Sequence, residues 1–295
     1  MGCPMLAALD LPSGAATRLL AQVPGWFMTW EASLSRFRPE SELNRINNQP
    51  GIPVAVSETM WQVLQAARRA EAQSEGLVTP VLLESLVAAG YTASFDRLNR
   101  EQGAYRAAPP PVFSLREVKF QPEQRTVCLP PGLRLDLGGI AKGWAAQRAM
   151  RLLEKYGPAM VDSGGDIAIS GLQSAGQPWL VGIDDPRQVG ESLGMLRLGR
   201  CGVATSGRDR RRWLQGGRWK HHIIDPRTGE PAETDVLTAT VIAPTVREAE
   251  MAAKVTLLRG SQQGLAWLEQ RSGLAGVVVT EDGKVLTSGS FTFPG

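Results

Sequence analysis

A short run of glycines, one carboxylate and one lysine in this sequence suits the binding of a phosphate. The run Asp136-Leu-Gly-Gly-Ile-Ala-Lys142-Gly143 follows the alternating apolar stretch 133–137, which predicts a strand, and precedes a helical pattern. A glycine turn that leads into a helix N-terminus presents free N–H groups to an anion. Because Lys142 in the first turn opposes the helix dipole, we expect it to contact an anion or a carboxylate. The alternative is an ordinary strand-to-helix corner.

A second candidate for chemistry is one of the two histidines. His222 begins the run His-Ile-Ile-Asp225-Pro226, and we expect it to lie in a strand that ends at Asp225, since a proline favours extended backbone before it. An imidazole titrates near neutral pH and can remove a proton from a hydroxyl. The alternative is a structural histidine whose hydrogen bonds are satisfied inside the fold.

The elements that must position these residues are both helices and strands. Strands outnumber helices in the pattern and do not alternate with them, which favours the α+β class. Residues 30–47 are dense in polar side chains and predict a surface loop of the kind that contacts ligands. Residues 90–111 include three consecutive prolines and predict an exposed loop. With no internal repeat or linker, we expect one domain over residues 1–295.

Local signals set several helix boundaries. We expect one helix from about Gly14 to Trp30, and a second from residue 58 to about 74 with Ser57 as its N-cap. The run Thr245-Val-Arg-Glu248 predicts a capping box at the start of a third.

Composition excludes several classes of protein. Of the 295 residues, 43% are hydrophobic and 21% charged, which is typical of a soluble globular chain. A net charge of +3 is too small to indicate nucleic-acid binding, and three cysteines without a C-x-x-C spacing indicate neither a disulfide framework nor a zinc site. No apolar run approaches the roughly 18 residues of a membrane span. We expect a cytoplasmic protein, or an exported one if an upstream leader is missing.

Four stretches together resemble one family, the FAD:protein FMN transferases or ApbE family. They are the 30–47 run, the 136–143 run, Asp162-Ser-Gly-Gly-Asp166, and Ala204-Thr-Ser-Gly207 with the later histidine run. The resemblance spans nearly the whole chain. It implies an ApbE-type, T-fold-like domain with mixed and antiparallel sheets and packed helices.

The resemblance also implies a reaction and a set of site residues. FAD is split at its pyrophosphate, and FMN is attached to a threonine or serine of an acceptor protein, so FAD and that protein are the expected partners. His222 and Asp225 are the implied catalytic residues. The implied FAD-binding residues are Met1, Ser35, Phe37, Asp136, Lys142, Gly164, Gly165, Asp166, Thr205, Ser206, Gly207 and Ile223.

The implied metal site departs from the family pattern. The resemblance implies Mg²⁺ held at Ala141 and at a helix that here reads Ala249-Glu-Met-Ala-Ala-Lys-Val255. Glu250 stands where the family has an aspartate, and Lys254 where it has a threonine. A surface ion pair worth ~0.3–0.5 kcal/mol is one interpretation. The other is that the Lys254 ammonium occupies the metal position and repels Mg²⁺. Two alternative functions follow, a non-catalytic FAD-binding protein and an FAD pyrophosphatase.

Overall fold

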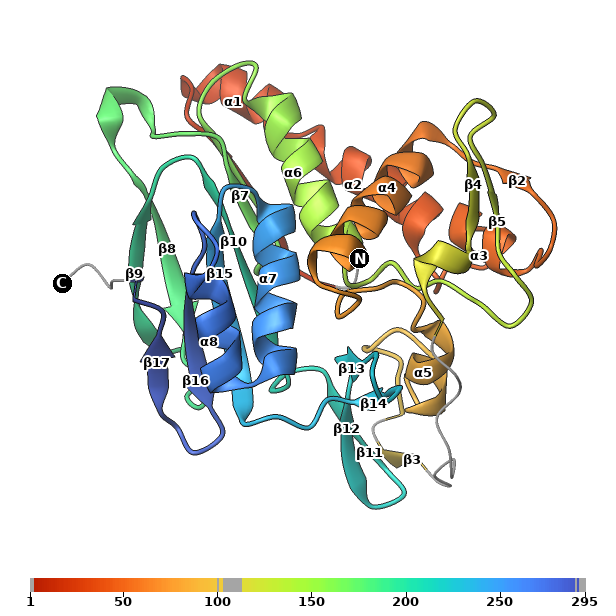
Figure 1. The fold of residues 1–295 in the computed structure, drawn as a ribbon. Helices are drawn as coiled ribbons and strands as arrows, with labels where there is room; N and C mark the ends of the chain where they lie inside the picture. The colour runs from red at the N-terminus through yellow and green to blue at the C-terminus, as the bar shows by residue number, and fades with distance from the viewer. Residues whose placement is uncertain (1–2, 100, 103–112, 290, 292–295) are drawn as a thin grey trace. The chain divides into compact units, whose positions relative to one another are not determined.

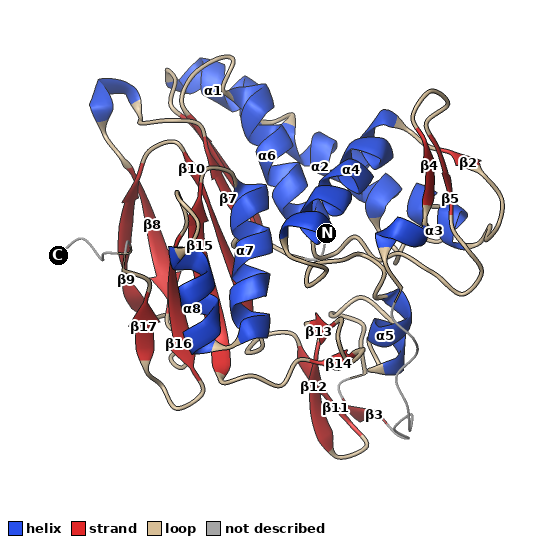
Figure 2. Cartoon of the chain, viewed as in Figure 1, coloured by secondary structure: helices blue, strands red, loops and turns tan. Residues whose placement is uncertain are grey.

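The computed structural model describes residues 3–99, 101–102, 113–289 and 291, which form two compact units (Figure 1). Unit 1 consists of described residues within 28–141 and 210–233, and unit 2 of those within 3–27, 142–209 and 234–291. The helices and the mainly antiparallel sheets confirm the α+β class (Figure 2). The expectation of one domain over residues 1–295 stays a prediction.

Unit 2 is built on a seven-stranded antiparallel sheet with the order β1-β6-β7-β10-β15-β16-β17. Its strands are short apolar runs broken by glycine turns, as the sequence predicts. Their bounds are β1 Met5–Leu9, β6 Ala159–Ser163, β7 Ile167–Ile169, β10 Cys201–Gly207, β15 Val236–Ala243, β16 Ala275–Thr280 and β17 Val285–Thr287. A separate hairpin pairs β8 Trp179–Asp184 with β9 Ser192–Leu198.

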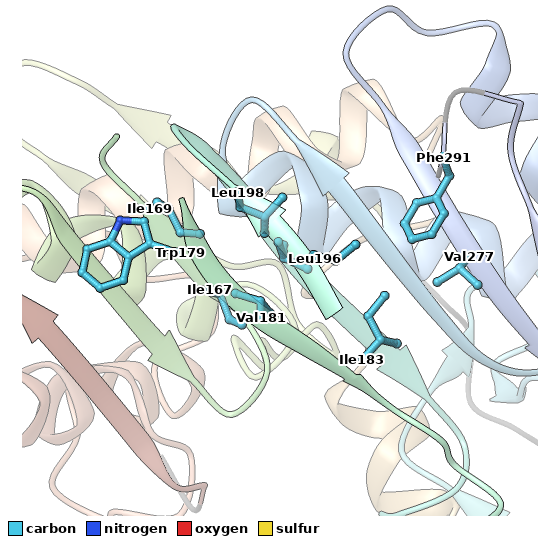
Figure 3. Close-up of a cluster of buried hydrophobic side chains, with 10 residues drawn as sticks. Ile167, Ile169, Trp179, Val181, Ile183, Leu196, Leu198, Val277 and Phe291 are labelled. Atoms are coloured by element: carbon cyan, nitrogen blue, oxygen red, sulfur yellow. The ribbon is translucent and has the colours of Figure 1, made fainter. Parts of the chain in front are cut away.

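The two faces of this sheet are covered differently. Helices α7 (Val246–Arg259) and α8 (Ser261–Glu269) lie side by side along one face (Figure 1). A Cβ on Gly202 of β10 would lie 2.0 Å from the backbone nitrogen of Val246, so only glycine allows α7 to approach this closely. The side chain of Val203, the next residue, points to the opposite face and belongs to an apolar cluster with residues of β8 and β9. Figure 3 shows members of this cluster, among them Val181 of β8 and Leu196 of β9.

Helix α7 begins at the predicted cap. The Thr245 hydroxyl accepts a hydrogen bond from the Glu248 N–H at 3.3 Å. The Glu248 carboxylate bonds that same hydroxyl at 2.9 Å rather than the Thr245 N–H, so half of the expected capping box forms.

The single helix expected from Gly14 to Trp30 is wrong. The structure has α1 (Ser13–Leu20) and α2 (Val23–Leu34), and a further helix, α6 (Ala141–Leu153), follows the glycine turn. Pro24 lies in the first turn of α2. Had one helix continued through, the proline ring would have met the carbonyl of residue 20, so the chain starts a new helix instead.

Unit 1 combines helices with three small sheets. The helices are α3 Glu42–Asn47, α4 Glu58–Gln73, α5 Leu83–Ala88 and the 3-10 turn η1 Leu115–Glu117. The strands are β2 Val54–Ala55, β3 Glu101–Gln102, β4 Lys119–Gln121, β5 Thr126–Cys128, β11 Arg212–Gln215, β12 Arg218–His221, β13 Ile224–Asp225 and β14 Glu230–Pro231. The N-cap predicted at Ser57 is confirmed, since its hydroxyl accepts the Met60 N–H at 3.2 Å. The 30–47 stretch is not all loop, because it contains the last turn of α2 and all of α3.

The strand expected at residues 133–137 is wrong. The segment is extended and buries Leu133, Leu135 and Leu137, but within the described residues it joins no sheet. The Asn47 amide supplies the pairing instead: it accepts from the Leu135 N–H at 2.8 Å and donates to the Leu135 carbonyl at 2.9 Å. A side chain thus does here what a neighbouring strand would do elsewhere.

The exposed loop expected over residues 90–111 is partly wrong. Tyr91 and Leu98 are buried in a cluster with Trp213 and Ile224, and residues 100 and 103–111 lie outside the described part of the chain. No helix within the described residues is long and apolar enough to cross a bilayer.

Candidate functional site

Asp136, the first residue of the glycine-rich run, is bound on both carboxylate oxygens within unit 1. Its Oδ1 accepts the Gly138 N–H at 2.7 Å, and its Oδ2 lies 2.6 Å from Nε of Arg36. A Cβ on Gly138 would lie 2.9 Å from the same Oδ1. The turn therefore places a fixed carboxylate and a fixed guanidinium together.

Arg36 is held by more than this ion pair. Its Nη2 donates to the Tyr91 carbonyl at 2.7 Å, and its guanidinium lies 4.1 Å from the Phe37 ring centroid and 4.8 Å from that of Tyr91. Tyr91 in turn stacks on Trp213 at 5.3 Å. Phe37 is 38% exposed, so this stack ends in an accessible aromatic face. Ser35 accepts the Phe37 N–H at 3.3 Å.

The two histidines have different environments in unit 1. His221 is buried; its Nε2 lies 3.0 Å from the Ala232 carbonyl, and its Nδ1 accepts the Ile223 N–H at 3.3 Å. These contacts assign a neutral, structural His221. His222 is half-buried and lies between β12 and β13. A strand does end at Asp225, as expected, but the expectation that His222 belongs to it is wrong. The reason is that pairing in β12 stops at His221, opposite Arg212.

Asp225 lies at the end of β13 and begins a tight turn. Its carboxylate accepts from the Arg227 backbone N–H at 2.9 Å and binds the Arg227 guanidinium through both oxygens. Its carbonyl accepts the Gly229 N–H at 2.8 Å. Arg227 therefore neutralises Asp225 and fixes the turn that follows His222.

Unit 2 contains a buried cluster of alternating charges. The Lys142 ammonium contacts the Asp166 carboxylate and lies 3.7 Å from Oε1 of Glu250. The Lys254 ammonium lies 3.1 Å from the same Oε1. The two carboxylates are 2% and 4% exposed, and the two lysines 18% and 16%. The pair on α7 is therefore not a surface ion pair.

The N-terminus of α6 binds an anion of the protein itself. The Gly143 N–H donates to Oε2 of Glu250 at 3.2 Å. A Cβ at this position would lie 2.5 Å from that oxygen, so a glycine is required for the carboxylate to come so close. The expectation that Lys142 faces a carboxylate agrees with this arrangement.

The other predicted residues of unit 2 form turns and strands nearby in sequence. Gly164 and Gly165 have φ of 67° and 91°, which only glycine adopts without strain, and the Gly165 N–H donates to Asp162 at 2.7 Å. Thr205 bonds the hydroxyl of Thr240 at 2.8 Å across the sheet. Ser206 is buried, and Gly207 ends β10.

Burial is the largest influence on the pKa values of Asp162, Glu250 and Tyr91. It raises the pKa of Asp162, with the Gly165 N–H acting in the opposite direction. It also raises the pKa of Glu250, which the ammonium groups of Lys254 and Lys142 oppose. Burial likewise raises the pKa of the Tyr91 phenol.

Comparison with known proteins identifies the family. A sequence profile described as the ApbE family matches residues 1–278. This chain belongs to the ApbE family. The FAD:protein FMN transferase of Treponema pallidum (strain Nichols) is 31% identical over 304 residues, covering 94% of this chain and 81% of that protein. The FAD:protein FMN transferase of Vibrio cholerae serotype O1 (strain ATCC 39541 / Classical Ogawa 395 / O395) is 32% identical over 271 residues, covering 88% and 79%.

The fold agrees with this membership. The crystal structure of the ApbE protein from Thermotoga maritima MSB8 superimposes with a TM-score of 0.84 at 24% identity, covering 97% of this chain and 93% of that one. The ApbE-type fold expected from the sequence is confirmed.

The metal implied for the ApbE family does not fit the residues of this chain. Mg²⁺ takes about six oxygens at roughly 2.1 Å. Both Glu250 oxygens already have donors, the Lys254 ammonium at Oε1 and the Gly143 N–H at Oε2. Two charges of +2 and +1 about 4 Å apart repel by roughly 8 kcal/mol at an effective dielectric constant near 20. Within the described residues, no three His, Cys, Asp or Glu side chains group as metal ligands.

The structure brings some of the predicted residues together and leaves others apart. Lys142, Asp166, Glu250 and Lys254 form one cluster in unit 2, and Arg36 links Phe37 to Asp136 in unit 1. Thr205 and Asp225 have partners outside the predicted set. Of the remaining predicted residues, Ala141 is the first residue of α6, and Ile223 is buried next to His222 in the sequence. Met1 lies outside the described residues.

Three residues of these networks, Arg36, Tyr91 and Trp213, were not predicted from the sequence. Arg36 stands inside the first matched stretch, and its place between Ser35 and Phe37 was the available signal. Tyr91 and Trp213 had no local signal, because the stack they form joins segments more than 100 residues apart.

Proposed function

We propose that this protein is an FAD:protein FMN transferase, which moves FMN from FAD to a threonine or serine hydroxyl of an acceptor protein. The observation that carries the proposal is the family match over residues 1–278, together with relatives of that name that cover most of the chain. The acceptor is a protein with the family's Asp-x-x-[Ser/Thr]-Gly-Ala-[Ser/Thr] motif.

The reaction exchanges one phosphate bond for another. The acceptor hydroxyl oxygen forms a bond to the phosphorus of the FMN half, the pyrophosphate P–O bond breaks, and AMP leaves with the bridging oxygen. His222 takes the proton of the attacking hydroxyl. His222 suits this role better than His221, because both ring nitrogens of His221 are in structural contacts. Asp225 holds the turn after the base.

The remaining residues bind FAD in this proposal. Phe37 offers its exposed ring to an aromatic group of the ligand, and Lys142 supplies positive charge for the diphosphate. The other FAD-binding residues proposed are Met1, Ser35, Asp136, Gly164, Gly165, Asp166, Thr205, Ser206, Gly207 and Ile223.

Incubation with FAD and a purified acceptor domain that carries the motif tests the proposal. The expected result is an acceptor that gains the mass of FMN less water, becomes fluorescent in a denaturing gel, and appears with equimolar AMP. An acceptor with alanine at the modified residue is the control and should stay unlabelled. An unlabelled wild-type acceptor would contradict the proposal.

The Lys254 ammonium beside Glu250 favours a second candidate, a protein that binds FAD without transferring FMN. Under that function FAD binds, and neither AMP nor labelled acceptor forms. Release of AMP and FMN without any labelling identifies an FAD pyrophosphatase instead.

A further inference from the structure

Helix α7 carries a cation of its own where the ApbE pattern has a metal ligand. We propose that the Lys254 ammonium replaces the divalent metal, so that this protein binds the diphosphate of FAD without Mg²⁺. The inference rests on the proposed function for the identity of the ligand. It does not rest on that function for the exclusion of the metal.

The first support is the pairing of charges around Glu250. Lys142 contacts Asp166 and lies near Glu250, and Lys254 contacts Glu250 from the other side. The two ammonium groups therefore offset the charge of the two carboxylates that they contact, and the half-buried Asp162, which also interacts with Asp166 and Lys142, adds a further negative charge nearby. A divalent ion added at Glu250 would have to displace an ammonium or remain beside it.

The second support is the fixed position of Glu250. Its helix is capped at Thr245 and packs directly on β10 and β15, and the carboxylate is 4% exposed. The Gly143 N–H holds the second oxygen at 3.2 Å. Glu250 therefore acts as an anchor for Lys254 rather than as an open ligand.

The third support is what the ammonium can still donate. Lys254 has three N–H groups, of which one faces Oε1 of Glu250 at 3.1 Å and another makes a weak contact with the Glu250 carbonyl at 3.5 Å. The side chain is 16% exposed, so the ammonium is anchored yet accessible. A point charge with a remaining donor can bind a phosphate oxygen, although it cannot orient one as an octahedral metal does.

Direct metal binding is the first test, and it needs no FAD. Mn²⁺, a spectroscopic substitute for Mg²⁺, is titrated into wild-type protein and into the double variant Glu250→Asp/Lys254→Thr. Electron paramagnetic resonance measures the free ion. We expect no binding to wild type at micromolar Mn²⁺ and binding to the double variant. Micromolar binding by the wild type would overturn the proposal.

FAD affinity is the second test. Calorimetric titration of wild type in EDTA and in millimolar Mg²⁺ should give Kd values within about twofold of each other. Lys254→Met should weaken FAD binding about tenfold in EDTA, and Lys284→Met, at an exposed lysine of the same unit, should not. Circular dichroism checks the fold of each variant. A tenfold gain of wild-type affinity with Mg²⁺, or an unchanged Kd in folded Lys254→Met, would refute the idea.

The two proposals fail separately. If wild type binds no FAD in either buffer, the proposed function fails, and the Mn²⁺ titration still decides whether Lys254 excludes the metal.

Discussion

Two carboxylates in different units, Asp136 and Glu250, have similar partners. Each accepts a hydrogen bond from a glycine N–H, that of Gly138 at 2.7 Å and that of Gly143 at 3.2 Å. Asp136 pairs with one arginine, whereas Glu250 lies between two lysines. The side chain of Asp136 is 13% exposed and that of Glu250 is 4% exposed.

The difference lies in how each cation is held. Arg36 stacks on Phe37 and donates to the Tyr91 carbonyl, so packing fixes it as well as charge. Lys142 and Lys254 place compact ammonium groups on flexible stems against carboxylates. The arginine pair is thus a rigid structural joint, whereas the lysine cluster depends mainly on its balance of charges.

The largest loss of stability should come from removing one lysine of the charged cluster in unit 2. Lys142→Met leaves the buried Asp166 without its ammonium, and we expect the free energy of unfolding to fall by about 3 kcal/mol. Urea denaturation followed by circular dichroism measures this. Lys155→Met, at an exposed lysine just beyond α6, is the control and should stay within about 0.5 kcal/mol. A loss as small as the control's would mean that the cluster is not charge-dependent.

The second largest loss of stability should come from adding a methyl group at Gly143, whose N–H donates to Glu250. Gly143→Ala places a Cβ against Glu250, and we expect a loss of about 1–3 kcal/mol in spite of alanine's better helix propensity. Gly25→Ala in α2, where nothing lies within 4 Å of the added Cβ, is the matched control and should be neutral or gain up to about 1 kcal/mol. Equal thermal stability of the two variants would contradict the close approach.

The smallest loss of stability should come from replacing Arg36, the partner of Asp136, by a lysine. Arg36→Lys keeps the charge but loses the planar contact with Phe37 and Tyr91, and we expect a loss of about 1 kcal/mol. Urea denaturation measures it, and Arg18→Lys in the last turn of α1 is the control. A neutral Arg36→Lys would mean that charge alone holds Asp136, and the contrast with Glu250 would disappear.

Local signals predicted the features whose cause is local. The caps at Ser57 and Thr245 and the paired glycines after Asp162 depend on residues a few positions apart. The sequence could not separate a strand from an extended segment at Leu135, because its partner is an Asn47 side chain 88 residues away. A similar limit applied to Tyr91, which is buried by Trp213 rather than by its neighbours.

The candidate site shows the same division. The i,i+4 contact of Glu250 with Lys254 follows from one turn of helix and was predictable. That Glu250 is buried, and that Gly143 donates to it, depends on a contact 107 positions away in the sequence. The sequence therefore predicted a pair of charges but not that a second lysine and a helix N-terminus would share it.

The amide of Asn47 has a consequence for motion. A strand inside a sheet is bonded by its neighbouring strands, whereas the backbone N–H and carbonyl of Leu135 both bond the Asn47 side chain, at 2.8 and 2.9 Å. The buried Leu135 side chain and the bond from the Asp136 N–H to the Pro80 carbonyl at 2.8 Å also hold the segment. The two backbone hydrogen bonds of Leu135 can therefore break without the opening of a sheet. Hydrogen exchange at the Leu135 amide should then report the loss of its contact with Asn47 rather than the unfolding of a sheet.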